Sequence, residues 1–181
     1  MNYLSPPERY SGISKTLHWL IALLAFAQLA MGKFFEVEAD EADEFLVWHT
    51  SLGMLVLALM LVRLGWRLTH TVPRLPRNAP GWQQLVARAM HIAFYALLIA
   101  LPLSGWMMTS VEGDAVSFFG WFGVPPLPVP GGEASEDLIE ETHEVLGNVL
   151  LVLAGIHVLA GLKHHYIDRD DVLRRMMPGS G

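Results

Sequence analysis

The sequence contains no cysteine among its 181 residues. This absence excludes disulfide bridges, zinc sites built on thiolates, iron–sulfur clusters and covalently attached haem. Charged residues are also scarce, at 17% of the chain, whereas soluble domains carry about 25%. Because 52% of the residues are hydrophobic, the composition indicates a membrane protein, and no nucleic-acid partner is expected.

Long stretches almost free of charge predict four membrane-spanning helices, at about residues 15–35, 45–68, 85–108 and 141–166. The predicted fold class is all-α: an integral membrane four-helix bundle in which residues 1–181 form a single domain. The first stretch follows Arg9 and Lys15 and could instead be a signal peptide, but its apolar run is long and no clear small-residue cleavage site follows. Pro102 and Gly105 predict a kink in the third helix.

One loop segment, Phe118–Val124, has the sequence FFGWFGV and is too short to cross a bilayer. We expect it to lie at the membrane interface as an aromatic patch, since aromatic rings favour that region.

Basic residues are nearly missing from one side of the predicted membrane. Four spans put both termini on the same side, where 11 of the 12 basic residues fall, and only Lys33 falls on the other. The excess of Lys and Arg predicts that both termini are cytoplasmic. The opposite side holds 14 of the 18 carboxylates, six in the loop after the first span and eight from Glu112 to Glu144.

Histidines recur at matching depths in these spans. His143 and His157 are fourteen residues apart in the fourth span, so on a helix they face within about 40° of each other and lie about 21 Å apart along the axis. Because successive spans run in opposite directions, His49 falls at the outer depth of His143, and His18 at the cytoplasmic depth of His157. Imidazole is costly in hydrocarbon unless it is bound. The pattern predicts two ligand pairs, His18 with His157 and His49 with His143.

A small residue follows each of these four histidines at the fourth position, on the same helix face: Ala22, Gly53, Gly147 and Gly161. Such a residue leaves room for a flat macrocycle beside the imidazole. His91 is followed by the large Tyr95, so we expect it to ligate no haem. The prediction is two haems b held between the helices by bis-histidine ligation, an arrangement that indicates electron transfer rather than oxygen binding.

Two other interpretations of the histidines stay open. They could be interfacial residues bonded to backbone or lipid head groups. They could also form a metal site without porphyrin, but such a site needs three or four ligands converging at one depth, together with carboxylates.

Further candidate residues lie on the cytoplasmic side. Lys15, Arg63 and Arg67 are at the level of the inner pair and could bind haem propionates. His164 follows His157 by seven residues, on nearly the same helix face. It is either a hydrogen-bond or proton partner of a quinone head group or a solvated interfacial histidine.

Several motifs together resemble the bacterial cytochrome b561 family, and the resemblance covers nearly the whole chain. They are Ser14–Trp19 (SKTLHW), Trp48–His49, Arg63 with Arg67, Ala100–Gly105 (ALPLSG), His143–Glu144, Leu162–Tyr166 (LKHHY) and Arg175–Pro178 (RMMP). The resemblance implies a bacterial inner membrane protein with two haems b, ligated by His18, His49, His143 and His157, and a quinone near His164.

Within this family the chain is most similar to the dihaem branch that passes electrons from periplasmic superoxide to ubiquinone. This implies a superoxide:ubiquinone oxidoreductase, with Lys33 at the superoxide entrance, His164 at the quinone, and lipid, ubiquinone and superoxide as partners. The acidic outer loops depart from what an anionic substrate favours. They favour an alternative, an electron-transfer cytochrome b subunit that passes quinol electrons to a cationic periplasmic redox protein. A membrane scaffold without redox chemistry is a third alternative.

Overall fold

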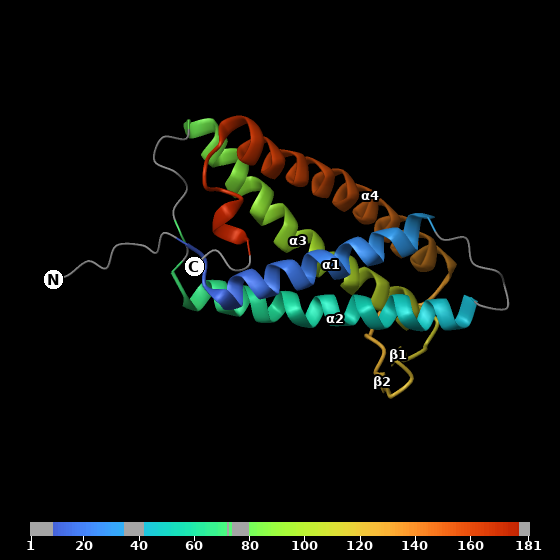
Figure 1. Ribbon diagram of the computed structural model, residues 1–181. Helices are drawn as coiled ribbons and strands as arrows, with labels where there is room; N and C mark the ends of the chain where they lie inside the picture. The colour runs from blue at the N-terminus through green and yellow to red at the C-terminus, as the bar shows by residue number, and fades with distance from the viewer. Residues whose placement is uncertain (1–8, 35–41, 72, 74–79, 178–181) are drawn as a thin grey trace.

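The structure, a computed structural model, describes residues 9–34, 42–71, 73 and 80–177. Four long helices lie alongside one another (Figure 1): α1 (Gly12–Phe34), α2 (Ala42–Thr69), α3 (Gly81–Val111) and α4 (Glu133–Lys163). Each is long and apolar enough to cross a membrane. The predicted all-α membrane four-helix bundle is therefore confirmed.

The main helix contacts join α1 to α2, α2 to α3 and α3 to α4. Arg63 of α2 donates hydrogen bonds to the carbonyl of Ser14 on α1 and to the hydroxyl of Tyr95 on α3. The start of α1, the end of α2 and the start of α3 therefore lie at one end of the bundle, which we call the tail end. We call the opposite end the hairpin end.

Two small clusters of buried side chains form the core. One consists of Ile21, Val56 and Met60. The other, which we call the leucine layer, consists of Leu29, Leu97 and Leu150, and Phe94 packs against it. Many other large apolar side chains of the helices are exposed, as is usual for helices that face lipid rather than water.

Helix α4 begins at Glu133, eight residues before the start predicted from its apolar run. Gly132 precedes it with a φ of +116°, a conformation that favours glycine. The carboxylates of Glu133 and Glu136 lie in the first turn, where the helix dipole favours negative charge. Hydrophobicity therefore marks the part of α4 that suits the membrane, while capping and dipole effects set where the helix starts.

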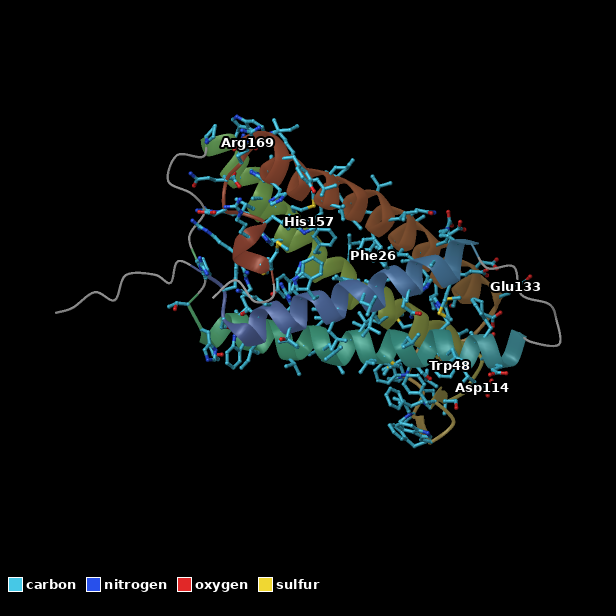
Figure 2. All side chains as sticks on the ribbon, viewed as in Figure 1. Phe26, Trp48, Asp114, Glu133, His157 and Arg169 are labelled. Carbon is cyan, nitrogen blue, oxygen red and sulfur yellow. The ribbon has the colours of Figure 1, made fainter. Side chains whose placement is uncertain are left out.

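The aromatic loop segment forms a β-hairpin, which was not predicted. Strands β1 (Val116–Phe118) and β2 (Phe122–Val124) pair antiparallel and project from the side of α2 (Figure 1). The buried hydroxyl of Ser51 on α2 accepts the Phe119 N–H at 2.7 Å, and its proton is shared between the carbonyls of Val47 at 2.5 Å and Ser117 at 2.9 Å. These bonds fix the hairpin against α2, beside Trp48 (Figure 2).

After α4 the chain reverses direction and runs across the tail end of the bundle. A π-helical turn, η1 (His164–Asp168), is followed by Arg169 in the left-handed conformation and by a short 3-10 helix, η2 (Arg174–Met176). The indole of Trp19 on α1 donates a hydrogen bond of 2.8 Å to the Met176 carbonyl. This segment therefore spans the tail end from α4 to α1.

Candidate cofactor sites between the helices

The structure brings together the two histidine pairs that the sequence predicts. At the hairpin end, the ring centroids of His49 on α2 and His143 on α4 are 6.3 Å apart, with ring planes inclined at 70°. At the tail end, the centroids of His18 on α1 and His157 on α4 are also 6.3 Å apart, with planes inclined at 72°. Figure 2 shows His157 between the helices. We call these the hairpin-end pair and the tail-end pair.

The ring separation in both pairs suits one shared metal. A metal–imidazole bond is about 2 Å long and a ring nitrogen lies about 1 Å from its centroid, so two rings facing one metal have centroids about 6 Å apart. Two neutral imidazole nitrogens are the donor set of a low-spin b-type haem iron. The geometry of both pairs therefore fits bis-histidine haem ligation.

The ring of His143 is held by α3. Ser104, which is buried, donates its hydroxyl to the Leu101 carbonyl at 2.8 Å and lies 2.9 Å from Nδ1 of His143. With its hydroxyl proton on the Leu101 carbonyl, the Ser104 oxygen can accept a proton from Nδ1 in the tautomer that is protonated there. The other nitrogen, Nε2, then keeps its lone pair for a metal, as in most metal-bound histidines.

Gly105 completes the support of His143. A Cβ at this position would lie 3.2 Å from Cε1 of the His143 ring, closer than nearly all real Cβ contacts. A side chain at residue 105 would therefore displace the ring. Sequence reasoning missed the roles of Ser104 and Gly105, although a hydroxyl beside a glycine in an apolar span was the signal that could have found them.

His49 is supported differently. Gln28 of α1 donates a hydrogen bond of 2.7 Å to the His49 backbone carbonyl, and Phe45 stacks near the His49 ring at a centroid distance of 6.3 Å. The buried Nδ1 of His49 has no hydrogen-bond partner among the described residues. A buried unsatisfied nitrogen is unusual in a folded protein and fits a site that binds a further group.

The small residues after the histidines have more than one role. A Cβ at Gly147 would meet nothing within 4 Å, and one at Gly161 would only touch Leu173 at 4.0 Å, so these positions leave open space. At Gly53, however, a Cβ would lie 3.2 Å from Nε2 of Gln28. Glycine at residue 53 therefore also leaves room for the Gln28 side chain of α1, and its role beside a macrocycle stays a prediction.

The tail-end pair lies among aromatic rings and cations. The Phe94 ring is 5.1 Å from that of His157, and the Trp19 ring is 5.4 Å from that of His18. Nearby, Arg67 places its guanidinium 5.6 Å from the centre of the Tyr95 ring.

The cations near the tail-end pair can receive an anion. Arg63 and Arg67 line one small pocket, and neither forms an ion pair with a carboxylate of the described residues. Lys15 lies one turn before His18 on α1. These positions suit the binding of a carboxylate from a ligand, because partly buried cations are stabilised by a negative partner.

His91 is half-buried on α3, on the tail-end side, and interacts electrostatically with Arg67. It also interacts electrostatically with His18 and His157 of the tail-end pair, although no ring stacking between His91 and either of them is found among the described residues. Its lack of a ligand role stays a prediction.

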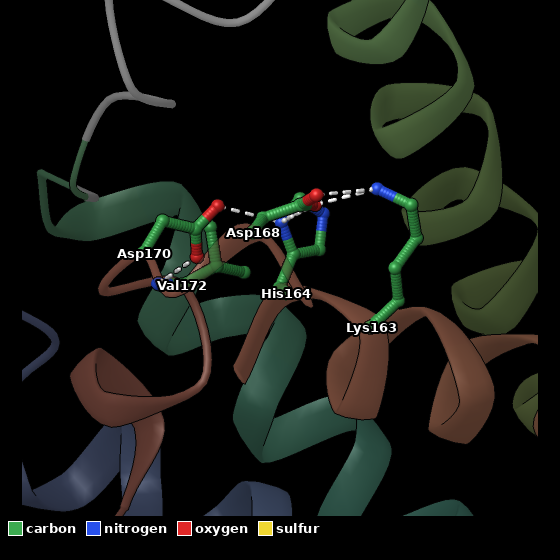
Figure 3. Close-up of polar contacts among 5 residues, drawn as sticks. All are labelled: Lys163, His164, Asp168, Asp170 and Val172. Carbon is green, nitrogen blue, oxygen red and sulfur yellow. Dashed lines mark hydrogen bonds and ion pairs between the residues drawn. The ribbon is translucent and has the colours of Figure 1, made fainter. Parts of the chain in front are cut away.

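His164 forms a polar cluster with two carboxylates that sequence reasoning missed (Figure 3). Its Nδ1 lies 2.6 Å from Oδ2 of Asp170 and 3.3 Å from Oδ2 of Asp168. Lys163 contacts both carboxylate oxygens of Asp168, at 2.6 and 2.8 Å. The three carboxylates that follow His164 in the sequence were the available signal.

Lys33 lies at the end of α1, at the hairpin end. Its ammonium group forms an ion pair of 3.5 Å with Glu144, the residue after His143. The single basic residue that the sequence places on this side is therefore partly neutralised by a neighbouring carboxylate.

A four-helix membrane bundle with paired histidines at two depths defines the class of membrane-embedded b-type cytochromes. The chain matches the prokaryotic cytochrome b561 family over residues 9–179. It is 35% identical over 184 residues to cytochrome b561 homolog 2 of Escherichia coli (strain K12), covering 98% of this chain and 95% of that protein. The chain belongs to the prokaryotic cytochrome b561 family, as a multi-pass membrane electron-transfer cytochrome for which the family implies haem b.

Two further relatives cover almost the whole chain. Cytochrome b561 homolog 1 of Escherichia coli (strain K12) is 33% identical, over 94% of this chain and 98% of that protein. The probable superoxide oxidase CybB of Yersinia pestis is 31% identical, over 94% of this chain and 97% of that protein.

Proposed function

We propose that this cytochrome is a dihaem oxidoreductase of the bacterial inner membrane that passes electrons from superoxide at the hairpin end to ubiquinone at the tail end. The observation that carries the proposal is that two histidine pairs of equal ring separation share α4. The 31% identity to a probable superoxide oxidase, over nearly the whole chain, supports superoxide as the donor. The asymmetry of basic residues supports a cytoplasmic tail end.

The proposed roles of the residues follow from their positions. His49 with His143, and His18 with His157, would each hold one haem b, which when bound supplies reversible one-electron chemistry at a fixed place. Lys15, Arg63 and Arg67 would bind propionates. Leu150 of the leucine layer is seven residues from each histidine of α4, so the layer places apolar side chains between the two sites.

The overall reaction balances at two ends. Two superoxide anions each lose one electron and leave as dioxygen near Lys33. One ubiquinone gains these two electrons and two protons from the cytoplasmic side to become ubiquinol. His164, at the tail end, would donate a proton to the quinone, because an imidazole ring can carry a proton on each nitrogen and pass one to a hydrogen-bonded acceptor.

The donor is tested by stopped-flow mixing of the purified oxidised protein with superoxide, while haem absorbance is followed. We expect fast haem reduction, followed by reoxidation when a ubiquinone analogue is present. Haem that superoxide leaves oxidised but quinol reduces would overturn superoxide as the donor.

The quinone end is tested with His164→Ala. We expect unchanged haem content and unchanged haem reduction by superoxide, but reoxidation by the ubiquinone analogue slowed by about 100-fold, a usual contribution of a positioned proton donor. An unaltered reoxidation rate would place the quinone away from His164.

A second function is favoured by the charge at the hairpin end. Glu112, Asp114 and Glu133 are exposed there, and Lys33 is paired with Glu144. An acidic surface suits a cationic protein partner. In this alternative the cytochrome passes quinol electrons to a periplasmic redox protein. Its reduced haem would then be oxidised by a basic redox protein, and we expect the rate of this oxidation to fall steeply as the ionic strength rises.

A further inference from the structure

The polar cluster at the start of η1 contains two carboxylates that differ in their partners. Both oxygens of Asp168 accept hydrogen bonds from Lys163. Asp170 has no lysine or arginine partner among the described residues; one of its oxygens accepts the Val172 N–H at 3.0 Å and the other lies 2.6 Å from Nδ1 of His164. Asp168 also lies 3.3 Å from Nδ1 of His164, but its charge is neutralised by Lys163, whereas the charge of Asp170 faces the imidazole at the shorter distance (Figure 3).

The backbone after α4 is shaped to bring Asp170 back to His164. The π-helical turn ends at Asp168, Arg169 adopts a φ of 54°, and the Asp170 N–H donates to the His164 carbonyl at 3.1 Å. A non-glycine residue in the left-handed region is uncommon and is retained only where its surroundings require it. Here the conformation of Arg169 reverses the chain within six residues and places the Asp170 carboxylate against the His164 ring.

The same groups are poorly suited to a metal ion. His164, Asp168 and Asp170 could each offer one ligand atom, and these atoms lie within 4.8 Å of one another. The ammonium of Lys163, however, already contacts both oxygens of Asp168 and would oppose a cation there. The geometry instead resembles an imidazole oriented by a carboxylate, the arrangement that fixes the tautomer of catalytic histidines.

We propose that Asp170 is a positioning residue for quinone reduction: its carboxylate keeps the Nδ1 proton of His164 in place, so that only Nε2 exchanges a proton with the quinone. This inference rests on the proposed function at His164. When the ring is doubly protonated, Nε2–H donates to a quinone carbonyl oxygen, and the proton moves to that oxygen as the quinone is reduced. The neutral ring left behind carries its proton on Nδ1 and regains the other from the cytoplasm at Nε2.

The experiment compares Asp170→Asn with Asp168→Asn in the full-length haem-loaded protein in lipid nanodiscs. Asparagine at 170 keeps an oxygen that can accept the Val172 N–H, so the turn is retained while the charge facing His164 is lost. Asparagine at 168 removes an equal charge from the same segment, one that is bonded to Lys163 and lies farther from Nδ1 of His164, at 3.3 rather than 2.6 Å, so it is the control for a loss of charge alone. His164 is assigned by comparison with His164→Ala.

Two readouts are measured. By ¹⁵N NMR at a pH where the ring is neutral, wild-type His164 is expected to carry its proton on Nδ1, Asp170→Asn to show both tautomers, and Asp168→Asn to match the wild type. In stopped-flow, reoxidation by the ubiquinone analogue is expected to slow at least about tenfold in Asp170→Asn, a partial loss of proton-donor catalysis. Its haem content and its haem reduction by superoxide should be unchanged.

The outcomes separate the two proposals. A normal quinone step in His164→Ala removes the quinone from this site and with it the proposed role of His164. A slow step in His164→Ala with a normal step in Asp170→Asn overturns the role of Asp170 alone. If Asp170→Asn does not fold, the wild-type spectrum still decides, because a neutral His164 with its proton on Nε2 contradicts the inference.

Discussion

The two histidine pairs have the same ring geometry but different surroundings. In the hairpin-end pair, His143 is held by a buried serine hydroxyl, and the nearest cation, Lys33, is paired with Glu144. The tail-end pair lies against Phe94 and Trp19, near two arginines that form no ion pair with a carboxylate of the described residues. The ring separation is the same in both pairs, whereas the charge and the hydrogen bonding around them differ, and such differences tune the potential of a bound metal.

The largest expected effect breaks one pair and spares the other. His49→Ala or His143→Ala should remove the same haem, and His18→Ala or His157→Ala should remove the other, since each pair needs both ligands. Haem per chain, measured as the pyridine haemochrome, should fall from two to one, with the remaining low-spin signal seen by electron paramagnetic resonance. His91→Ala is the control, and this variant should keep both haems. If it carried only one haem, the assignment of the ligand pairs would be wrong.

A prediction of intermediate size concerns Ser104, the side chain that supports the hairpin-end pair. Ser104→Ala removes the partner of Nδ1 in His143 and should weaken haem binding at the hairpin end by about 10- to 100-fold, the usual effect of losing a group that orients a metal ligand. The tail-end haem should be unaffected. Haem titration of the apoprotein measures both sites.

The control for this prediction is Ser104→Thr, which keeps the hydroxyl and should restore binding. Equal weakening of both haems, or no rescue by threonine, would mean that Ser104 acts through folding rather than through His143.

The smallest expected effect concerns charge at the hairpin end. Glu144→Gln frees Lys33 and should speed haem reduction by superoxide a few-fold, while Lys33→Glu should slow it a few-fold, because surface charges steer an anion weakly at physiological salt. The rates are measured by stopped-flow at two ionic strengths. Equal rates in both variants would exclude steering by this ion pair and would favour the electron-transfer alternative.

The features that could be predicted from the sequence are those that depend on depth in the membrane. The spans and the meeting of His18 with His157 and of His49 with His143 follow from hydrophobicity and helical rise. Sequence reasoning missed features that depend on contacts between distant segments. Ser104 and His143, which are in contact, are 39 residues apart in the sequence, and Ser51 is 66 to 68 residues from the hairpin residues that it bonds. It also missed the early start of α4, because residues 133–141 are mostly polar and five of the nine are acidic, so no long apolar run marks them.

The separation of the two histidine pairs along α4 gives the proposed reaction a dependence on voltage. An electron moving from the hairpin-end pair to the tail-end pair advances about 21 Å of a hydrocarbon core about 30 Å thick. Moving one charge across a whole membrane costs about 2.3 kcal/mol per 100 mV, so a cytoplasm that is negative inside opposes this transfer by roughly 1.6 kcal/mol per 100 mV. Each inward electron would therefore work against the resting potential and help to charge the membrane, so that removal of superoxide would conserve energy and slow down in strongly energised cells.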